Sequence, residues 1–162
     1  MRHIISAIVE NRPGVLARII AVISGRGYNI ETLNVGPAQE TDVSRLTMTV
    51  AGDEHVLEQV SKQLNKMVDV IKVTDLTGTR HHDCELLVVE VAAPRGARRT
   101  EIIELATIAK AQVVGVSETS LTLQFVGRQD EISELLQLLR PYKVLDLDRS
   151  GTIAVARPVS EG

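Results

Sequence analysis

The chain has 162 residues, a net charge of −3 from 18 Lys and Arg against 21 Asp and Glu, and 44% hydrophobic residues. Two Tyr, one Phe, no Trp and no basic excess leave neither stacking surfaces nor phosphate-binding charge, so we expect no nucleic-acid partner. The apolar runs are far shorter than the roughly 20 residues that cross a bilayer, and the single cysteine indicates no disulfide framework. We therefore expect a cytoplasmic protein that binds no membrane.

Residues 1–77 follow the order β-α-β-β-α-β. Apolar residues recur at spacings of three, four and seven between Gly14 and Ser24, as in an amphipathic helix. Residues 45–50 alternate polar and apolar side chains, as in a strand with one buried face. Asp53 is placed to cap a second helix. The expected elements are strands at 3–10, 29–35, 43–50 and 68–76, with helices at 14–24 and 53–66.

The same order recurs after a polar stretch, residues 78–83, which we interpret as a linker. Asp130 is placed to cap the last helix, which must end before Pro141. Gly52 and Gly127 stand at equivalent places, 75 positions apart (127 − 52). The expected elements are strands at 84–91, 113–116, 121–126 and 144–148, with helices at 100–110 and 130–139.

These patterns predict an α+β fold with two ferredoxin-like βαββαβ domains in tandem, residues 1–77 and 84–157. In each domain two helices should cover one face of a four-stranded antiparallel sheet and leave the other face bare. Domains of this size are marginally stable alone, and their sheets have free edges. We therefore expect self-association, and the alternative is a monomer whose two halves cover each other.

No residue pattern typical of catalysis is present. The run from His81 through His82, Asp83 and Cys84 to Glu85 is the one cluster of possible metal ligands. Neighbouring residues of an extended segment point in opposite directions, and no second ligand pair follows, so a solvated linker is the better interpretation. Phosphate-binding glycine motifs and a nucleophile elbow are also missing. We expect no catalytic residue, no metal and no cofactor here, and the alternative is a small enzyme acting through Cys84 or the histidine pair.

The loop from Asn11 to Gly14 has the chemistry of an anion site. Pro13 presets a helix-compatible backbone angle, and Gly14 removes the side chain from the opening turn of the helix. The N–H groups of that turn lie at the positive end of the helix dipole. A carboxylate could accept them while the Asn11 amide binds the rest of a small polar ligand. The alternative is a capped turn that binds nothing.

At this loop the sequence resembles a known family. Residues 11–19 resemble the opening loop and helix of ACT domains, the small-molecule regulatory modules of amino-acid metabolism. Residues 26–33, 44–47 and 57–64 are similar, more narrowly, to the small regulatory subunits of acetolactate synthase (acetohydroxyacid synthase). The resemblance extends over the whole chain, and Arg149-Ser150-Gly151 near its end is similar to the C-terminal domain of that family.

The resemblance implies a regulatory protein of branched-chain amino acid biosynthesis. In this family the separate large catalytic subunit uses thiamine diphosphate, a divalent metal and FAD to condense pyruvate. The small subunit holds none of these, activates the large subunit, and makes it sensitive to feedback inhibition by valine, and sometimes by leucine or isoleucine. A stand-alone tandem amino-acid sensor, without such a partner, is the alternative.

The resemblance also implies where the effector binds. In ACT domains of this kind the effector lies between two ACT domains, which implies a homodimer built through residues 1–77. Valine would offer a carboxylate to the helix N-terminus and a branched apolar group to a pocket. The effector-binding residues that the resemblance implies are Asn11, Gly14, Val15 and Leu16 from one ACT domain and Asn29 and Ile30 from the other.

Overall fold

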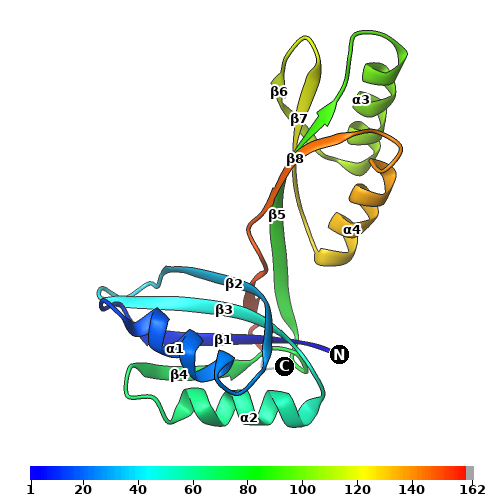
Figure 1. Ribbon diagram of the computed structural model, residues 1–162. Helices are drawn as coiled ribbons and strands as arrows, with labels where there is room; N and C mark the ends of the chain where they lie inside the picture. The colour runs from blue at the N-terminus through cyan, green and yellow to red at the C-terminus, as the bar shows by residue number, and fades with distance from the viewer. Residues whose placement is uncertain (160–162) are drawn as a thin grey trace. The chain divides into compact units, whose positions relative to one another are not determined.

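The computed structural model describes residues 1–159, and the chain separates into two compact units (Figure 1). The first unit consists of Met1–Asp83 together with the chain from Thr152 onward, and the second consists of Cys84–Gly151. Each unit has the order β-α-β-β-α-β and an antiparallel sheet. The predicted fold class, α+β with two βαββαβ units in tandem, is confirmed.

In the first unit two helices lie on one face of a four-stranded sheet with the strand order β2-β3-β1-β4 (Figure 1). Alternate residues of the central strands, such as Ile5 and Met48, are buried with Ile19 and Leu64 of the helices in one core, as the period-two and period-3.6 patterns require. The elements are β1 (Arg2–Glu10), α1 (Val15–Ser24), β2 (Asn29–Pro37), β3 (Val43–Ala51), α2 (Glu54–Asn65) and β4 (Val70–Asp75).

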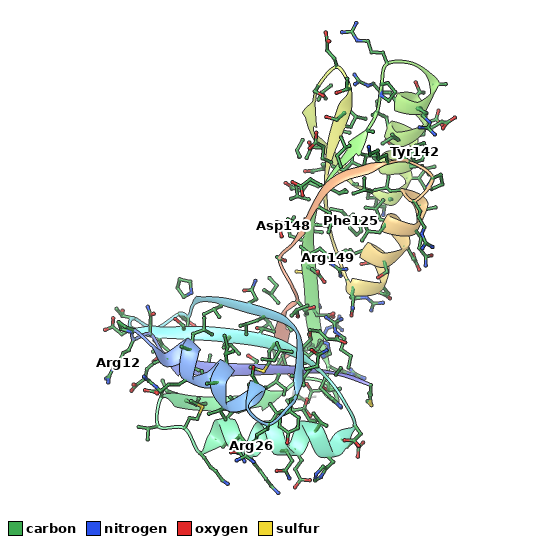
Figure 2. The ribbon with its side chains drawn as sticks, viewed as in Figure 1. Arg12, Arg26, Phe125, Tyr142, Asp148 and Arg149 are labelled. Atoms are coloured by element: carbon green, nitrogen blue, oxygen red, sulfur yellow. The ribbon has the colours of Figure 1, made fainter. Side chains whose placement is uncertain are left out.

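The second unit repeats this arrangement with the strand order β6-β7-β5-β8. Leu87, Leu123 and Ile132 belong to its core, and Phe125 lies within it (Figure 2). The carboxylate of Glu85 is buried and accepts two hydrogen bonds from Arg149, at 2.6 and 3.1 Å. The elements are β5 (His81–Ala92), α3 (Ala97–Ala109), β6 (Gln112–Val116), β7 (Ser120–Gly127), α4 (Gln129–Leu138) and β8 (Val144–Arg149).

One of the two predicted helix caps is confirmed and the other is wrong. The Asp53 side chain accepts a hydrogen bond from the Val56 N–H at 3.0 Å, at the start of α2. In contrast, α4 begins one residue before Asp130, and its N-cap is Arg128. The Glu131 carboxylate accepts the Arg128 N–H at 2.7 Å, so a capping-box contact sets this helix start.

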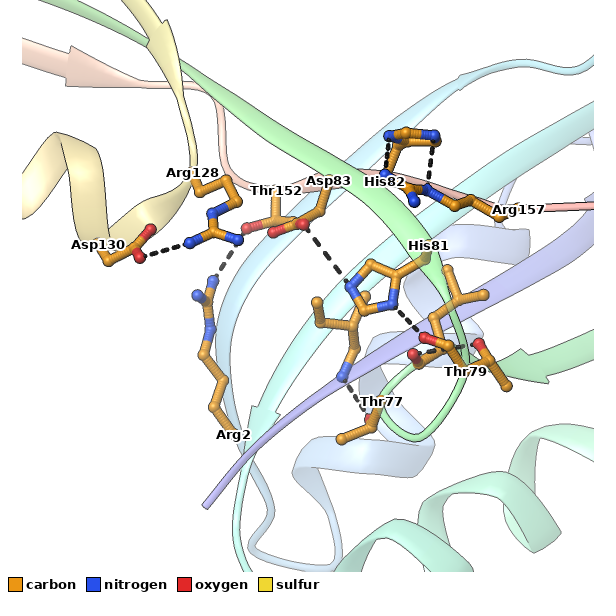
Figure 3. Close-up of polar contacts among 12 residues, drawn as sticks. Arg2, Thr77, Thr79, His81, His82, Asp83, Arg128, Asp130, Thr152 and Arg157 are labelled. Carbon is orange, nitrogen blue, oxygen red and sulfur yellow. Dashed lines mark hydrogen bonds and ion pairs between the residues drawn. The ribbon is translucent and has the colours of Figure 1, made fainter.

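The polar stretch 78–83 differs from the predicted linker because β5 already begins at His81. The imidazole of His81 lies 2.8 Å from the Thr79 carbonyl, and His82 accepts a hydrogen bond from Arg157 at 2.8 Å (Figure 3). The Arg157 N–H also donates to the Arg80 carbonyl. The last part of the chain thus orders a segment whose composition is typical of a solvated turn.

A strand that the sequence did not predict, β9 (Ile153–Ala156), pairs with β5 and lies on the open face of the first sheet. Arg45 donates to the Ala154 carbonyl at 2.9 Å. Arg2 donates to the Thr152 hydroxyl at 2.9 Å (Figure 3). Thr47 belongs to the open face and is only 3% exposed. The expectation of a bare face is therefore wrong for part of this sheet, because the chain's own end covers it.

The same strand separates the predicted domain boundary from the structural one. The sequence predicts a domain over residues 84–157, and the second compact unit covers Cys84–Gly151. Thr152 and Ala154 are 2% and 4% exposed, and they accept hydrogen bonds from Arg2 and Arg45 of the first unit. The residues that follow β8 therefore belong to the first compact unit, and their strand β9 pairs with β5.

Candidate functional site

The loop between β1 and α1 presents a helix N-terminus without a side-chain cap. Gly14 is the N-cap of α1 and has a φ of +85°, in the left-handed region that glycine adopts at no steric cost. The Val15 N–H donates to the Arg12 carbonyl at 3.3 Å. The next two N–H groups have no partner inside the helix, by the geometry of any helix start. With no acidic residue in the first turn, the positive end of the dipole is not neutralised by α1 itself.

A guanidinium that the sequence reading missed lies one turn into this helix. The Nη1 atom of Arg18 is 3.2 Å from the position that a Cβ at residue 14 would occupy. Its Nε and Nη2 atoms each lie 2.9 Å from an Asp69 carboxylate oxygen. The spacing of four residues from Gly14 is the sequence signal for this proximity. Arg18 thus places a guanidinium nitrogen beside the proposed anion position, while Asp69 balances its charge.

Among the predicted residues of this loop, Asn11 and Leu16 are exposed and Val15 is not. The backbone N–H of Asn11 donates to the Asp42 carbonyl at 2.9 Å, and Asn11 as a whole is exposed. Leu16 is 39% exposed, whereas Val15 is 2% exposed and belongs to the core of the first unit. Val15 therefore has only its backbone to offer a ligand.

Asn29 and Ile30 form the start of β2, an edge strand of the sheet. Asn29 is exposed, and Ile30 is half-buried against the core. The pairing register with β3 shifts between Ile30 and Thr32, so a bulge follows these two residues directly. Bulges bend a strand and re-aim its side chains, and they are common beside functional sites.

A single chain does not bring the predicted site together. At one end of the sheet Arg2 and Asn29 both pair with Ala51, and at the other Glu10 pairs with Val43. The nine residues of β1 separate these ends by about 27 Å at about 3.4 Å per residue. Figure 2 shows Arg12, beside the glycine loop, and Arg26, shortly before β2, at opposite ends of α1. Asn11 and Gly14 lie together, and Asn29 and Ile30 lie far from them.

The histidine segment shows no metal-binding arrangement. His81 and His82 engage different partners, and the His81 Nε2 atom lies 3.6 Å from an Asp83 oxygen (Figure 3). Within residues 1–159 no three His, Cys, Asp or Glu side chains gather as metal ligands would. Cys84 is half-buried and has a free thiol. In the same part of the chain no helix has the length and apolarity to cross a membrane.

The βαββαβ fold and the glycine at the start of its first helix define the first unit as an ACT-type module. Comparison with family models agrees. Residues 5–72 match the model described as "AHAS small subunit-like ACT domain", and residues 84–158 match "Small subunit of acetolactate synthase". The chain thus matches an ACT-domain model in its first half and a model of acetolactate synthase small subunits in its second half.

Whole-length relatives give the same family. The chain is 41% identical to the acetolactate synthase small subunit of Aquifex aeolicus, over 98% of this chain and 83% of the relative. It is 43% identical to the probable acetolactate synthase small subunit of Archaeoglobus fulgidus, over 97% and 98%. The crystal structure of the Thermotoga maritima small subunit superposes with a TM-score of 0.89 at 28% identity, over 98% and 99%. The chain belongs to the family of acetolactate synthase small subunits.

Proposed function

We propose that this chain is the regulatory subunit of an acetolactate synthase, that it activates a separate large catalytic subunit, and that it makes this subunit sensitive to feedback inhibition by valine. Family membership over the full length of the chain supports the regulatory role. Thiamine diphosphate, a divalent metal and FAD would belong to the large subunit.

The main support for the effector proposal is the distance between its two half-sites, the glycine loop and the start of β2. The glycine loop and the start of β2 lie at opposite ends of one sheet, and β2 is an edge strand. If two copies pair their β2 strands antiparallel about a twofold axis, Asn29 of one chain comes opposite the end of β2 in the other. That end lies beside the glycine loop, because Pro37 pairs with Ser44 of β3 and Ser44 pairs with Val9 of β1. A homodimer through the ACT domains would therefore complete two equivalent sites.

The two half-sites offer different contacts, and together these contacts suit the carboxylate, the ammonium group and the side chain of an amino acid. The N-terminus of α1, with Arg18 beside it, suits a carboxylate. The exposed Asn29 side chain has an amide oxygen for an ammonium group. Leu16 and Ile30 are partly exposed aliphatic side chains that can contact a branched apolar group. Valine has all three of these groups on a small frame, and leucine and isoleucine test how much room the aliphatic contacts leave.

Feedback inhibition then requires that valine favour one of two states of the complex. The effect of valine on the catalytic subunit measures a coupling free energy, typically about 1–3 kcal/mol, or a factor of about 5–150 in affinity. The effector must therefore contact the two states differently, and a site shared between two chains responds to any change in their pairing.

The experiment that tests this proposal is reconstitution. The purified chain is mixed with the large subunit of the same organism, and acetolactate formation from pyruvate is measured with and without valine. We expect a higher rate on addition of the chain and a loss of that gain with valine. A rate that the chain leaves unchanged would favour the stand-alone sensor. Calorimetric titration with valine, leucine and isoleucine should give one site per chain, and sedimentation should give a dimer.

A further inference from the structure

The open face of the first sheet carries two cations in one row of cross-strand neighbours. Ile8 of β1 pairs with Arg45 of β3 on one side and with Lys72 of β4 on the other. Residues that pair directly across strands share a face of the sheet. No ion pair of either cation occurs within residues 1–159. The row therefore places one positive charge on each side of a single aliphatic side chain, that of Ile8.

The next row on the same face is hydroxylic. Ser6 pairs with Thr47 on β3 and with Thr74 on β4. Ser6 is 4% exposed, yet it belongs to the face opposite the helices. Its burial is explained by β9, whose residues Val155 and Ala156 lie over this part of the sheet. A polar row beside a charged row is thus partly enclosed by the end of the chain.

These two rows and β9 enclose a cavity of about 320 Å³. Among residues 1–159 its lining includes no carboxylate; the polar lining residues are Ser6, Arg45, Lys72 and Thr74, and the others are aliphatic. The Nη2 atom of Arg45 is occupied by the Ala154 carbonyl, but its Nε atom is buried and has no hydrogen-bond partner among the described residues. A buried donor without an acceptor is costly, and a bound anion would supply one.

We propose that this cavity binds phosphate, either as the free ion or as the monoester of a small organic molecule. Two cations and two hydroxyl groups from three adjacent strands can serve several oxygens at once, which suits a tetrahedral dianion better than a planar carboxylate. The Lys72 ammonium group would supply a positive charge, and Arg45 would donate from its Nε atom, which Ala154 does not occupy.

A neighbouring cavity of about 450 Å³ has room for the organic part of an ester. It shares Ile8, Arg45 and Lys72 with the first cavity and adds aliphatic residues, including Val43 and Ile71. Glu40 is the carboxylate among its described lining residues, and it does not line the first cavity. The residues of the effector loop line neither cavity, so this site is distinct from the proposed valine site.

The test is calorimetric titration of the full chain with inorganic phosphate and with methyl phosphate, at constant ionic strength in chloride. Lys72→Gln removes one cation, and Ser6→Ala removes one buried hydroxyl while keeping a side chain of similar size. The matched control is Lys62→Gln, because Lys62 lies on α2 and pairs with Glu58 at 2.6 Å. Thermal unfolding of each variant without ligand establishes that it folds.

We expect phosphate to bind the parent chain and the control equally, and Lys72→Gln to weaken binding about fivefold or more, since Lys72 is exposed to solvent screening. Ser6→Ala should weaken it as well. Tighter binding of methyl phosphate than of phosphate would identify an ester as the ligand, and the reverse order would identify the free ion. No measurable binding of either, or equal binding by Lys72→Gln and Lys62→Gln, would overturn the proposal.

Discussion

Substitution of Gly14 by Asp tests the effector site at its most sensitive position. Gly14 has a φ of +85°, where a residue with a Cβ loses about 1–2 kcal/mol. The added Cβ would meet only the Nη1 atom of Arg18, at 3.2 Å, which is the far end of a flexible side chain. The backbone cost is therefore the main cost to folding, and we expect a modest decrease in the unfolding midpoint.

The expected loss of binding is larger than the loss of stability. An Asp carboxylate at this position competes for the N–H groups that the effector's carboxylate would accept, and it repels that carboxylate. Losing one charge-assisted hydrogen bond costs about 1.5–3 kcal/mol, so valine should bind at least about tenfold more weakly. An ion pair between the new Asp and Arg18 restores little, because the Arg18 side chain is 53% exposed.

The assay is valine inhibition of the reconstituted complex together with calorimetry on the isolated chain. The matched control is Gly96→Asp, since Gly96 is also the N-cap of a helix with positive φ and has open space around its Cβ position, but lies in the second unit. The control should retain valine binding even if its unfolding midpoint falls as far. Normal inhibition of a complex that carries Gly14→Asp would refute the placement of the effector at this loop.

Three further changes test the dimer, the strand β9 and one helix cap. In mixed dimers of one Asn11→Ala chain and one Asn29→Ala chain, a shared pocket leaves one intact and one doubly damaged site, so calorimetry should find half the normal number of tight valine sites. Two equally weakened sites and no tight site would place each site within one chain. A chain ending at Gly151 loses the hydrogen bonds to Arg2 and Arg45, and should be less stable to denaturant by about 1–3 kcal/mol, unlike a control chain ending at Val159. The Val56 N–H lowers the pKa of Asp53 from its ordinary 3.8, so Asp53→Ala should lower the unfolding midpoint at pH 7. The difference in midpoint between parent and variant should disappear as the pH falls from 3.8 through the lowered pKa, because the parent carboxylate is then protonated. A difference that stays constant with pH would contradict the cap.

The helices and strands of both units were predictable because their signals are local. The helix α1 begins and ends within one residue of the predicted range 14–24, since its apolar stripe and the flanking glycines are close in sequence. The start of α4 also lies within one residue of the predicted position, but its cap was predicted wrongly because two acidic residues compete for that role. Asp130 pairs with the Arg128 side chain at 2.8 Å, and Glu131 takes the backbone contact.

The strand β9 could not be predicted from the sequence. Without it, the open face of the first sheet was predicted to be entirely bare. Four small aliphatic residues, 153–156, carry no period that distinguishes a strand from a tail. Their position depends on contacts with residues more than a hundred positions away, such as Arg45 with Ala154. The candidate site was predictable in part for the same reason. The glycine loop is a local motif, whereas the proximity of Arg18 and the opposite location of Asn29 follow from the assembled sheet.

The path of the chain also has a consequence for how the protein is made. The first unit contains both the beginning of the chain and residues 152–157, and the second unit is inserted between them. A ribosome that releases the chain from its N-terminus delivers all of Met1–Asp83 long before β9. The strand that lies on the open face of the first sheet is thus synthesised only after the whole second unit. Completion of the first unit therefore has to wait for the synthesis of residues 84–151.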